Sequence, residues 1–392
     1  MIGEPKRNAG TSRDTRGFSR EFVLVVCFFC LIALLGVTAL VSRMYHKRVH
    51  SLADQWFSYG EADFKAGNTK KALIEYRNAL AFSPANVMFQ FHLALALAAD
   101  GQLPEARAYL LPLLSESPGS GEINLALARI AAQQSHVQDA MLYYNSAIYG
   151  EWSDDPIEMR WNVRKELCEF LLSHGAASQA EPALVALDDN TPAGEVERQK
   201  ATGQLLLKGQ MWNRALAEFR SVLERDRNDP DALEGAGTAA FQLHNYAQAI
   251  GFLSRLPKDR STDPGVPSML ETARQIDALD PFRPGLTMGE KVRRTAHALD
   301  IAMARAQSCT GPSGAPGAAP SPKSELSGLL ATAQQSDKQW TERNMTRDPD
   351  LMNAAMALVF RIETAAAKSC GQPTGENLAL WTIGQNLGSN LP

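Results

Sequence analysis

The chain has 392 residues, of which 45% are hydrophobic and 21% charged, and its formal net charge is −4. This is ordinary globular composition, and the length is sufficient for two or more domains. The slight acidity argues against a nucleic-acid-binding protein, which normally presents a basic face. Aromatic residues make up only 7%, and long runs of Ala and Leu favour helices over strands. We therefore expect an all-α protein.

The first expected element is a membrane helix. Residues 22–41, FVLVVCFFCLIALLGVTALV, contain no charge, and a helix of 20 residues spans about 30 Å, the thickness of a bilayer core. We predict a transmembrane helix over 22–43 after a basic tail over 1–21. A signal peptide cleaved near residues 37–39 is the alternative, although the apolar run is longer than the usual signal core.

The charges that flank this segment predict its orientation. Five Lys and Arg residues precede it and three follow it: Lys6, Arg7, Arg13, Arg16 and Arg20, then Arg43, Lys47 and Arg48. Because positive charge is enriched on the cytoplasmic side, the N-terminus is expected in the cytoplasm. The rest of the chain would then lie outside the cytoplasmic membrane.

From Ala53 the sequence reads ADQWFSYGEADFKAGNTKKALIEYRNALAFSPAN and resembles a tetratricopeptide repeat. The residues at that motif's spacings are Trp56, Gly60, Gly67, Ala72, Tyr76, Ala79 and Pro84. One departure is Asp63, which stands where a large residue is usual and which neighbouring Phe64 can replace.

The pattern recurs five more times, with starts near Ala53, Val87, Gly121, Trp161, Val196 and Pro230. A small residue in the first helix falls on Gly60, Ala94, Ala128, Cys168, Gly203 and Gly237. An alanine in the second helix falls on Ala72, Ala106, Ala140, Ala180, Ala215 and Ala249, followed four residues later by Tyr76, Leu110, Tyr144, Leu184, Phe219 and Leu253. Small residues let paired helices approach closely, and the large residue fills the remaining gap.

The resemblance covers residues 53–260 and implies a superhelical solenoid of six helix–turn–helix repeats. The longest step between repeats contains YGEWSDDPIE, residues 149–158. We interpret this stretch as an enlarged loop, either a binding feature or a tolerated surface insertion.

The resemblance also implies an inner groove lined by the first helix of each repeat. In the first half its positions hold Phe57, Glu61, Phe64, Phe91, Leu95, Leu125 and Arg129, and in the second half Lys165, Glu169, Lys200, Gln204, Lys208, Glu234 and Phe241. The first set is largely apolar and would mark a protein-binding site, although any of its members could instead pack between repeats. The family's carboxylate clamp is not expected, since its Asn position holds Glu61, Leu95, Arg129, Glu169, Gln204 and Thr238.

A C-terminal helical module is expected over 266–392. Its helices are predicted over 268–279, 287–309, 324–344, 349–370 and 376–386, with a disordered Gly/Pro/Ser linker over 310–324. Cys309 and Cys370 each end a long helix, so we predict a disulfide between them, worth about 4 kcal/mol in the chain-entropy model. Two free thiols are the alternative. A disulfide requires an oxidising compartment.

The other cysteines and the catalytic motifs add little. Cys27 and Cys30 lie in the apolar segment and Cys168 at a small-residue position, so all three are interpreted as packing residues. The sequence has no P-loop, zinc-protease, nucleophile-elbow or dinucleotide motif, and its histidines lack metal-ligand spacing. We expect no catalytic residues, no metal and no cofactor. An enzyme in the C-terminal module is a third, weaker alternative.

The architecture is similar to that of bacterial envelope proteins with one N-terminal helix and a tetratricopeptide domain. It predicts a single-pass inner-membrane protein whose repeats and C-terminal module are periplasmic. The expected function is a protein–protein interaction scaffold or co-chaperone. The alternative is a structural subunit of a secretion, pilus or exopolysaccharide export complex. The expected partners are other proteins, and the lipid bilayer contacts residues 22–43.

Overall fold

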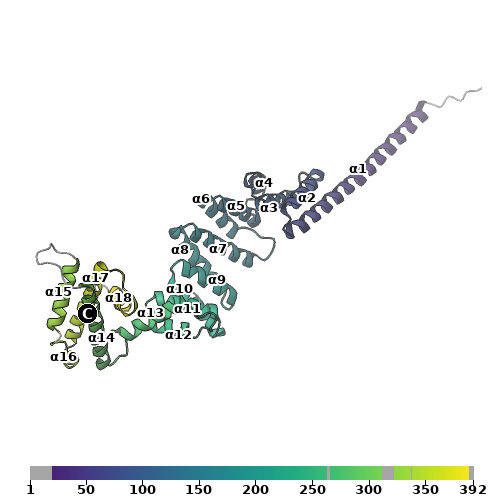
Figure 1. The fold of residues 1–392 in the computed structure, drawn as a ribbon. Coiled ribbons are helices and arrows are strands. Elements are labelled where there is room, and N and C mark those ends of the chain that lie inside the picture. The colour runs from purple at the N-terminus through teal and green to yellow at the C-terminus, as the bar shows by residue number, and fades with distance from the viewer. Residues whose placement is uncertain (1–19, 263–264, 311–321, 337, 388–392) are drawn as a thin grey trace, which may run out of the picture. The chain divides into compact units, whose positions relative to one another are not determined.

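The computed structural model describes residues 20–262, 265–310, 322–336 and 338–387. Every regular element in these ranges is an α-helix, as predicted, and the one isolated bridge joins Ser120 to Glu151. The chain forms two compact units, residues 1–156 and 157–392, and Figure 1 shows their helices in chain order. Residues 1–19 of the predicted basic tail and residues 311–321 of the predicted linker lie outside the described residues.

The first unit contains three helical hairpins, the first of which is formed by the end of a long N-terminal helix and the helix after it. Its helices are α1 (Arg20–Lys65), α2 (Thr69–Phe82), α3 (Val87–Ala99), α4 (Leu103–Glu116), α5 (Gly121–Gln133) and α6 (Val137–Ile148). The second unit continues with three hairpins, α7 (Pro156–Ser173) with α8 (Ala177–Asp189), α9 (Val196–Lys208) with α10 (Trp212–Arg225), and α11 (Pro230–Gln242) with α12 (Tyr246–Leu253). Repeats 1 to 6 below denote these six hairpins, repeat 1 being the end of α1 with α2.

α1 joins two elements that the sequence suggested separately. The helix runs unbroken for 46 residues through the apolar segment and into repeat 1. It is long and apolar enough to cross a membrane, and the share of its most apolar window that is buried in the protein is 0%. The residues between the apolar segment and the repeat, SRMYHKRVHS, contain no Gly or Pro to interrupt a helix.

The small and large positions of the repeats pack as the sequence predicted. A Cβ atom at Gly60 would lie 2.7 Å from the Tyr76 ring, and one at Gly237 would lie 2.4 Å from Leu253 Cδ2. Since real Cβ contacts are longer than this, only glycine lets these helix pairs approach so closely. The alanines and large residues at the matching positions of all six repeats are at most 1% exposed.

The turn inside each hairpin is closed by one residue with positive φ. Gly67, Gly101 and Gly175 take this place in repeats 1, 2 and 4, with φ between 66° and 83°. Ser135, Gln210 and His244 take it in repeats 3, 5 and 6, with φ between 57° and 59°. In each repeat the next residue's N–H donates to a carbonyl five residues back, as from His136 to Ala131 at 2.9 Å, so the first helix ends in a Schellman-type turn.

The enlarged loop of the sequence is fastened to repeat 3. Gly121 N–H donates to Glu151 O at 2.8 Å, and Glu151 N–H donates to Gly119 O at 2.7 Å. The Trp152 indole covers Gly121, where a Cβ would lie 2.3 Å from the ring, and its Nε1 donates to Ala147 O at 3.0 Å. These bonds explain why the loop adopts one conformation along the end of α5.

The C-terminal module follows the repeats as α13 (Val266–Leu279), α14 (Met288–Thr310), α15 (Pro322–Ser336), α16 (Glu342–Arg347), α17 (Pro349–Cys370) and α18 (Gly375–Leu387). The single helix expected over 324–344 is wrong, because the structure has two helices there. The second begins at its own N-cap, Thr341, whose hydroxyl accepts from Asn344 N–H.

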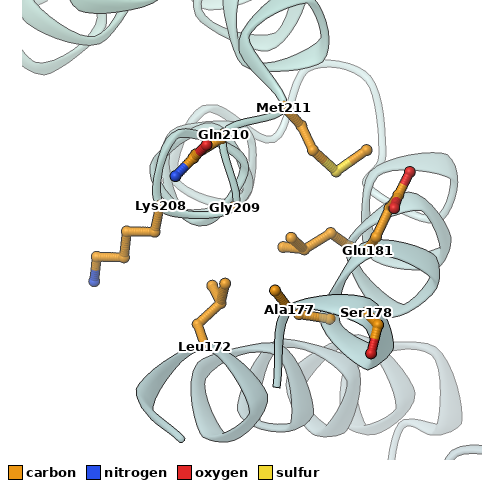
Figure 2. Close-up of a pocket in the computed structure, with 10 residues that line it drawn as sticks. Leu172, Ala177, Ser178, Glu181, Lys208, Gly209, Gln210 and Met211 are labelled. Atoms are coloured by element: carbon orange, nitrogen blue, oxygen red, sulfur yellow. The ribbon is translucent and has the colours of Figure 1, made fainter. Parts of the chain in front are cut away.

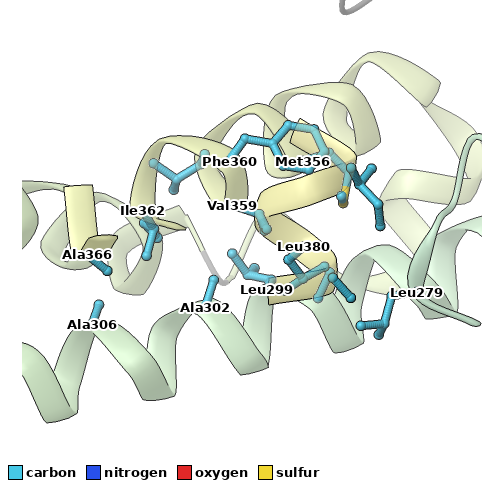
Figure 3. Close-up of a cluster of buried hydrophobic side chains, with 14 of the residues drawn as sticks. Leu279, Leu299, Ala302, Ala306, Met356, Val359, Phe360, Ile362, Ala366 and Leu380 are labelled. Carbon is cyan, nitrogen blue, oxygen red and sulfur yellow. The ribbon is translucent and has the colours of Figure 1, made fainter. Parts of the chain in front are cut away.

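One core joins α13, α14, α15, α17 and α18. α14 and α17 approach through alanines, with Ala302 and Ala306 facing Ile362 and Ala366 (Figure 3). Tyr246 of repeat 6 belongs to the same buried cluster. Its hydroxyl accepts a 2.8 Å hydrogen bond from Asn386 Nδ2 of α18, so the module packs directly onto the last repeat.

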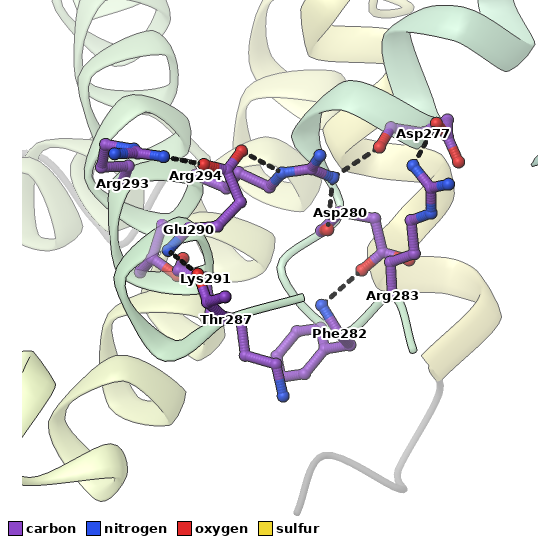
Figure 4. Close-up of polar contacts among 10 residues, drawn as sticks. Asp277, Asp280, Phe282, Arg283, Thr287, Glu290, Lys291, Arg293 and Arg294 are labelled. Atoms are coloured by element: carbon purple, nitrogen blue, oxygen red, sulfur yellow. Dashed lines mark hydrogen bonds and ion pairs between the residues drawn. The ribbon is translucent and has the colours of Figure 1, made fainter. Parts of the chain in front are cut away.

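The connection between α13 and α14 is held by arginines (Figure 4). Arg294 Nη1 donates to Asp277 O at 2.6 Å and to Asp280 O at 3.1 Å, and its Nε donates to Glu290 at 3.0 Å. Arg283 Nη1 pairs with the Asp277 carboxylate at 2.6 Å. Arg294 therefore satisfies carbonyls at the end of α13 that have no partner within the helix.

Candidate functional site

The predicted groove of repeats 1 and 2 contains a polar centre formed by three residues. Tyr76 of α2 donates its hydroxyl to Glu61 Oε1 at 2.6 Å. His92 Nδ1 of α3 lies 2.5 Å from the same oxygen. Glu61 thus links both helices of repeat 1 to the first helix of repeat 2, and its side chain is 24% exposed.

The charge of Glu61 follows from these partners. Burial alone would raise the pKa of its carboxyl, but the hydrogen bond from Tyr76 and the charge of His92 lower the pKa below the ordinary value of 4.5. Glu61 is therefore an anion at neutral pH, at a position where the clamp type of this family would hold a neutral amide.

Aromatic side chains surround this anion. Phe57 stacks on Phe89 with ring centroids 4.8 Å apart, and its edge meets His92 at 5.0 Å. Phe64 meets Tyr76 at 6.4 Å, and Phe91 meets His92 at 5.7 Å. Phe57, Phe64 and Phe91 are half-buried, so each combines packing between helices with a solvent-facing edge.

The remaining predicted residues of this half differ in exposure. Leu95 is half-buried against the core of repeats 1 to 3. Leu125 is only 6% exposed, so it is a packing residue more than a binding residue. Arg129 is exposed on α5. We call Phe57, Glu61, Phe64, Phe91 and His92 the aromatic patch.

In the charged half of the predicted groove, Lys200 forms ion pairs with carboxylates of the protein itself. Lys200 Nζ lies 2.9 Å from Glu197, 3.3 Å from Asp229 and 3.3 Å from Asp231, and its side chain is 13% exposed. Burial alone would lower the pKa of Lys200, but these three carboxylates raise it above its ordinary value. Asp229 is also the N-cap of α11, so Lys200 stabilises the junction of repeats 5 and 6.

Arg260, which follows α12 in the chain, forms two more ion pairs with α11. Its Nη2 lies 3.1 Å from Asp231 and 2.8 Å from Glu234. Lys165 pairs with Glu169 at 2.9 Å within α7. Of the second set of groove positions, Lys165, Glu169, Lys200 and Glu234 are therefore paired with side chains of the protein itself.

A pocket of about 460 Å³ lies between repeats 4 and 5 (Figure 2). Leu172, Ala177 and Met211 contribute to its apolar lining, and Lys208 and Glu181 lie on opposite sides of it. Of the predicted groove residues, Lys208 is the one that lines this pocket. A Cβ at neighbouring Gly209 would lie 2.3 Å from Leu184, so we interpret the pocket as a gap between packed repeats.

The structure brings the two predicted cysteines together at the ends of α14 and α17. Their sulfurs are paired, with Cα atoms 5.8 Å apart; formation of the bond in the cell stays a prediction. Nearby, Arg305 pairs with fully buried Glu363 and donates to Gly371 O at 3.0 Å. Burial raises the pKa of Glu363 to about 7, and the Arg305 charge opposes that rise.

Sequence reasoning missed two residues of these sites. His92 is the only ionisable residue in VMFQFHLALALAA, and a polar residue inside so apolar a run was the available signal. Arg260 lies in the segment after the repeats, and nothing in its local sequence indicates that it turns back onto α11.

The described residues offer little for catalysis or metal binding. No group of three or more His, Cys, Asp or Glu side chains among them could hold a metal ion. Cys168 is buried, and burial followed by the charge of Glu169 raises its pKa to about 12, which suits packing and disfavours a reactive thiolate.

Family comparisons match the repeats. Two family models, each described as tetratricopeptide repeat, match residues 57–121 and 93–156 in one case and 206–270 in the other. None of the curated proteins compared with the chain matches it.

Several solved structures are similar. YrrB, a tetratricopeptide repeat protein with an unusual peptide-binding site, is 17% identical, covers 51% of this chain and 97% of its own, and has a TM-score of 0.39. PilF of Pseudomonas aeruginosa is 14% identical over 56% of this chain and 97% of its own, with a TM-score of 0.40. PilW, a widely conserved type IV pilus biogenesis factor, is 16% identical, covers 56% of this chain and 98% of its own, and has a TM-score of 0.41.

Proposed function

Since the chain belongs to the tetratricopeptide repeat family, we propose that it is a membrane-anchored scaffold that binds segments of other proteins at the aromatic patch. Such repeats are stacked units that use their surfaces for binding. In this proposal α1 is the anchor, the N-terminus is cytoplasmic, and the repeats and C-terminal module lie outside the cytoplasmic membrane. Two finer roles are a co-chaperone and a subunit of a secretion, pilus or exopolysaccharide export complex.

The aromatic patch is the observation that carries the proposal. Three half-exposed phenylalanines surround an ionised Glu61 on the first helices of two adjacent repeats. Aromatic edges bind apolar side chains with little loss of conformational entropy, and a half-buried carboxylate favours a basic neighbour. The expected ligand is therefore an apolar segment that carries a Lys or Arg.

Substitution of the patch separates the two finer roles. We expect Phe57→Leu with Phe64→Ser and Phe91→Ser to abolish all client binding by a co-chaperone, because no aromatic edge remains. A complex subunit would keep its partner through another surface such as the C-terminal module. Co-purification from membranes measures both outcomes, with Gln204→Ser and Lys208→Ser, exposed on α9, as the matched control. Unchanged binding of every protein in the triple variant would contradict the aromatic patch as the binding site and would leave only a complex subunit that binds through another surface.

The proposed compartment is tested by counting thiols in whole cells. The chain has five cysteines, so a bridge between Cys309 and Cys370 leaves three free. After acid quench and denaturation, a large maleimide should add three times without reduction and five times after it. Cys309→Ser should give four additions under both conditions. Five additions to the unreduced wild type would contradict both the bridge and an oxidising compartment.

A further inference from the structure

Repeat 1 exposes a face that the next two repeats bury. Tyr59 of α1 occupies the position that Leu93 holds in repeat 2 and Leu127 holds in repeat 3, at successive steps of 34 residues. Leu93 and Leu127 are at most 1% exposed because the preceding repeat covers them, whereas Tyr59 is 47% exposed. The face of α1 and α2 that would receive a preceding repeat is therefore open.

A contact between second helices identifies the same face. Arg77 of α2 pairs with Glu105 of α4 at 3.0 Å, and Arg220 of α10 donates to Gln248 of α12 in the equivalent place. Lys71 is the repeat 1 counterpart of Glu105 and Gln248. Lys71 therefore occupies the position that the basic side chain of a preceding repeat would contact.

This open face contains a pocket of about 440 Å³, which we call the end pocket. Its walls are formed by Trp56, Tyr59, Ala62, Asp63, Lys71 and Glu75. The Trp56 and Tyr59 rings meet edge to face with centroids 6.1 Å apart. Asp63 Oδ2 lies 2.6 Å from Lys71 Nζ, and Asp63 Oδ1 accepts from Asn68 Nδ2 at 3.0 Å.

One carboxylate oxygen of Glu75 in this pocket is available to accept a hydrogen bond. Its side chain is 8% exposed, and its Oε1 lies 3.7 Å from Lys71 Nζ. Its Oε2 is buried and has no hydrogen-bond partner among the described residues. Burial and then the charge of Asp63 raise the pKa of Glu75, as expected for a carboxyl that lacks enough positive charge around it.

We propose that the end pocket binds the guanidinium or ammonium group of an Arg or Lys side chain of a protein partner. Two carboxylates face one resident cation, Lys71, so one further positive charge balances the site. The unpartnered Glu75 Oε2 supplies an acceptor, and the Trp56 and Tyr59 rings supply faces for a cation–π contact. This site is separate from the aromatic patch and gives the scaffold a second point of attachment.

The position of the pocket on α1 favours a protein over a lipid headgroup as the source of the cation. Trp56 follows the end of the predicted span, residue 43, by 13 residues of continuous helix, which is about 20 Å of rise. The headgroup layer extends only about 6 Å beyond the hydrocarbon core on each side. Ammonium groups of lipids therefore do not reach the pocket along the helix axis.

The test uses the full chain in detergent micelles with its six tryptophans replaced by 5-fluorotryptophan. Fluorine NMR follows the Trp56 resonance, assigned with Trp56→Phe, during titration with butylguanidinium, butylammonium or butanol. We expect saturable shifts with the two cations and none with butanol, and the stronger of the two cations identifies Arg or Lys as the preferred side chain. A response to butanol equal to that of the two cations would show that the pocket binds only the butyl group, and would overturn the proposal.

Variants assign the binding to the carboxylates. Glu75→Gln and Asp63→Asn should each weaken cation binding about tenfold, and Lys71→Met should tighten it by removing the competing charge. The matched control is Glu218→Gln, the counterpart of Glu75 in repeat 5, which also has an unpartnered Oε2 but is half-buried next to Asp188 of repeat 4. Unchanged titration of Trp56 in both Glu75→Gln and Asp63→Asn, with circular dichroism like that of wild type, would contradict the proposal.

Discussion

Repeats 1 and 2 and repeats 5 and 6 use the same scaffold but treat their groove positions differently. In both pairs a glycine in the first helix receives a large ring from the second, Tyr76 against Gly60 and Phe219 against Gly203. On the groove positions, however, repeats 1 and 2 present aromatic edges around Glu61, while Lys200 of repeat 5 is enclosed by carboxylates.

This difference shows that the family pattern determines packing and leaves the groove free to vary. A lysine at a groove position is available to a partner only if the chain does not neutralise it first. At Lys200 three carboxylates do so, and at repeat 6 Arg260 neutralises Asp231 and Glu234. We therefore propose the first helices of repeats 1 and 2 as the binding surface, and the following predictions test this contrast.

The largest expected effect concerns the scaffold that both regions share. Phe219 fills the space between α9 and α11, where a Cβ at Gly203 or Gly235 would lie 2.8 Å or 2.3 Å from its ring. Phe219→Ala should cost about 3–5 kcal/mol because it leaves a cavity. Hydrogen exchange of α9 to α11 measures this loss, with Phe82→Ala, 38% exposed, as the control. A loss below about 1 kcal/mol would mean that Phe219 does not hold the repeats together.

A smaller effect tests whether the charged half is structural. Lys200→Met should destabilise repeats 5 and 6 by about 1–3 kcal/mol, since it leaves Asp229 without its cation. It should leave partner binding unchanged. Urea-induced loss of protection in α9 and α11 gives the first quantity and co-purification the second. If stability is unchanged and binding is lost, Lys200 is a ligand contact and the contrast drawn above is wrong.

Glu61 predicts a pH dependence confined to repeats 1 and 2. Its folded-state pKa is below 4.5, so its stabilising contribution is present above pH 4.5 and is lost as the pH falls through the lower folded value. The free energy of unfolding of wild type should exceed that of Glu61→Gln by about 1 kcal/mol at pH 7, and the difference should shrink as the pH falls below 4.5. Hydrogen exchange of α2 and α3 at several pH values measures it. A constant difference across this range would show that Glu61 is not ionised as inferred.

The smallest effect concerns the hairpin turns, which contain one residue with positive φ in each of the six repeats. Ser135, Gln210 and His244 have positive φ. This conformation is unfavourable for any residue with a Cβ atom, and glycine adopts it without that cost in free energy. Replacing each by Gly should stabilise its repeat by about 0.5–1 kcal/mol. Gly175→Ala should have the opposite sign. Thermal unfolding of the single variants measures the sign of each change in stability. Destabilisation by all three glycine substitutions would refute the strain assigned to these turns.

The sequence predicts the repeats well because their packing rule is local and periodic. The expected starts at residues 87, 121, 196 and 230 coincide with those of α3, α5, α9 and α11. The fourth repeat begins five residues before its expected Trp161, because Pro156 is favourable in the first turn of a helix. The sequence also suggested that Cys309 and Cys370 pair, because each of them ends a long helix.

Exposure and pairing of groove residues could not be predicted in the same way. Phe57 was expected in the groove and also packs on Phe89, because one ring can serve both roles. Lys200 is neutralised by residues about 30 positions later, and that pairing depends on how successive repeats stack. Asp63 departed from the family pattern for a reason that only the structure gives: its position lies on an open face and binds Lys71.

Site-specific photo-crosslinking in living cells tests the central contrast most directly. A benzophenone side chain is placed at Phe91 on α3 or at Gln204, an exposed groove position on α9 in the charged half. We predict protein adducts from position 91 that disappear with Phe57→Leu and Phe64→Ser, and none from position 204. Adducts from position 204 with none from position 91 would contradict the assignment of partner binding to the aromatic patch.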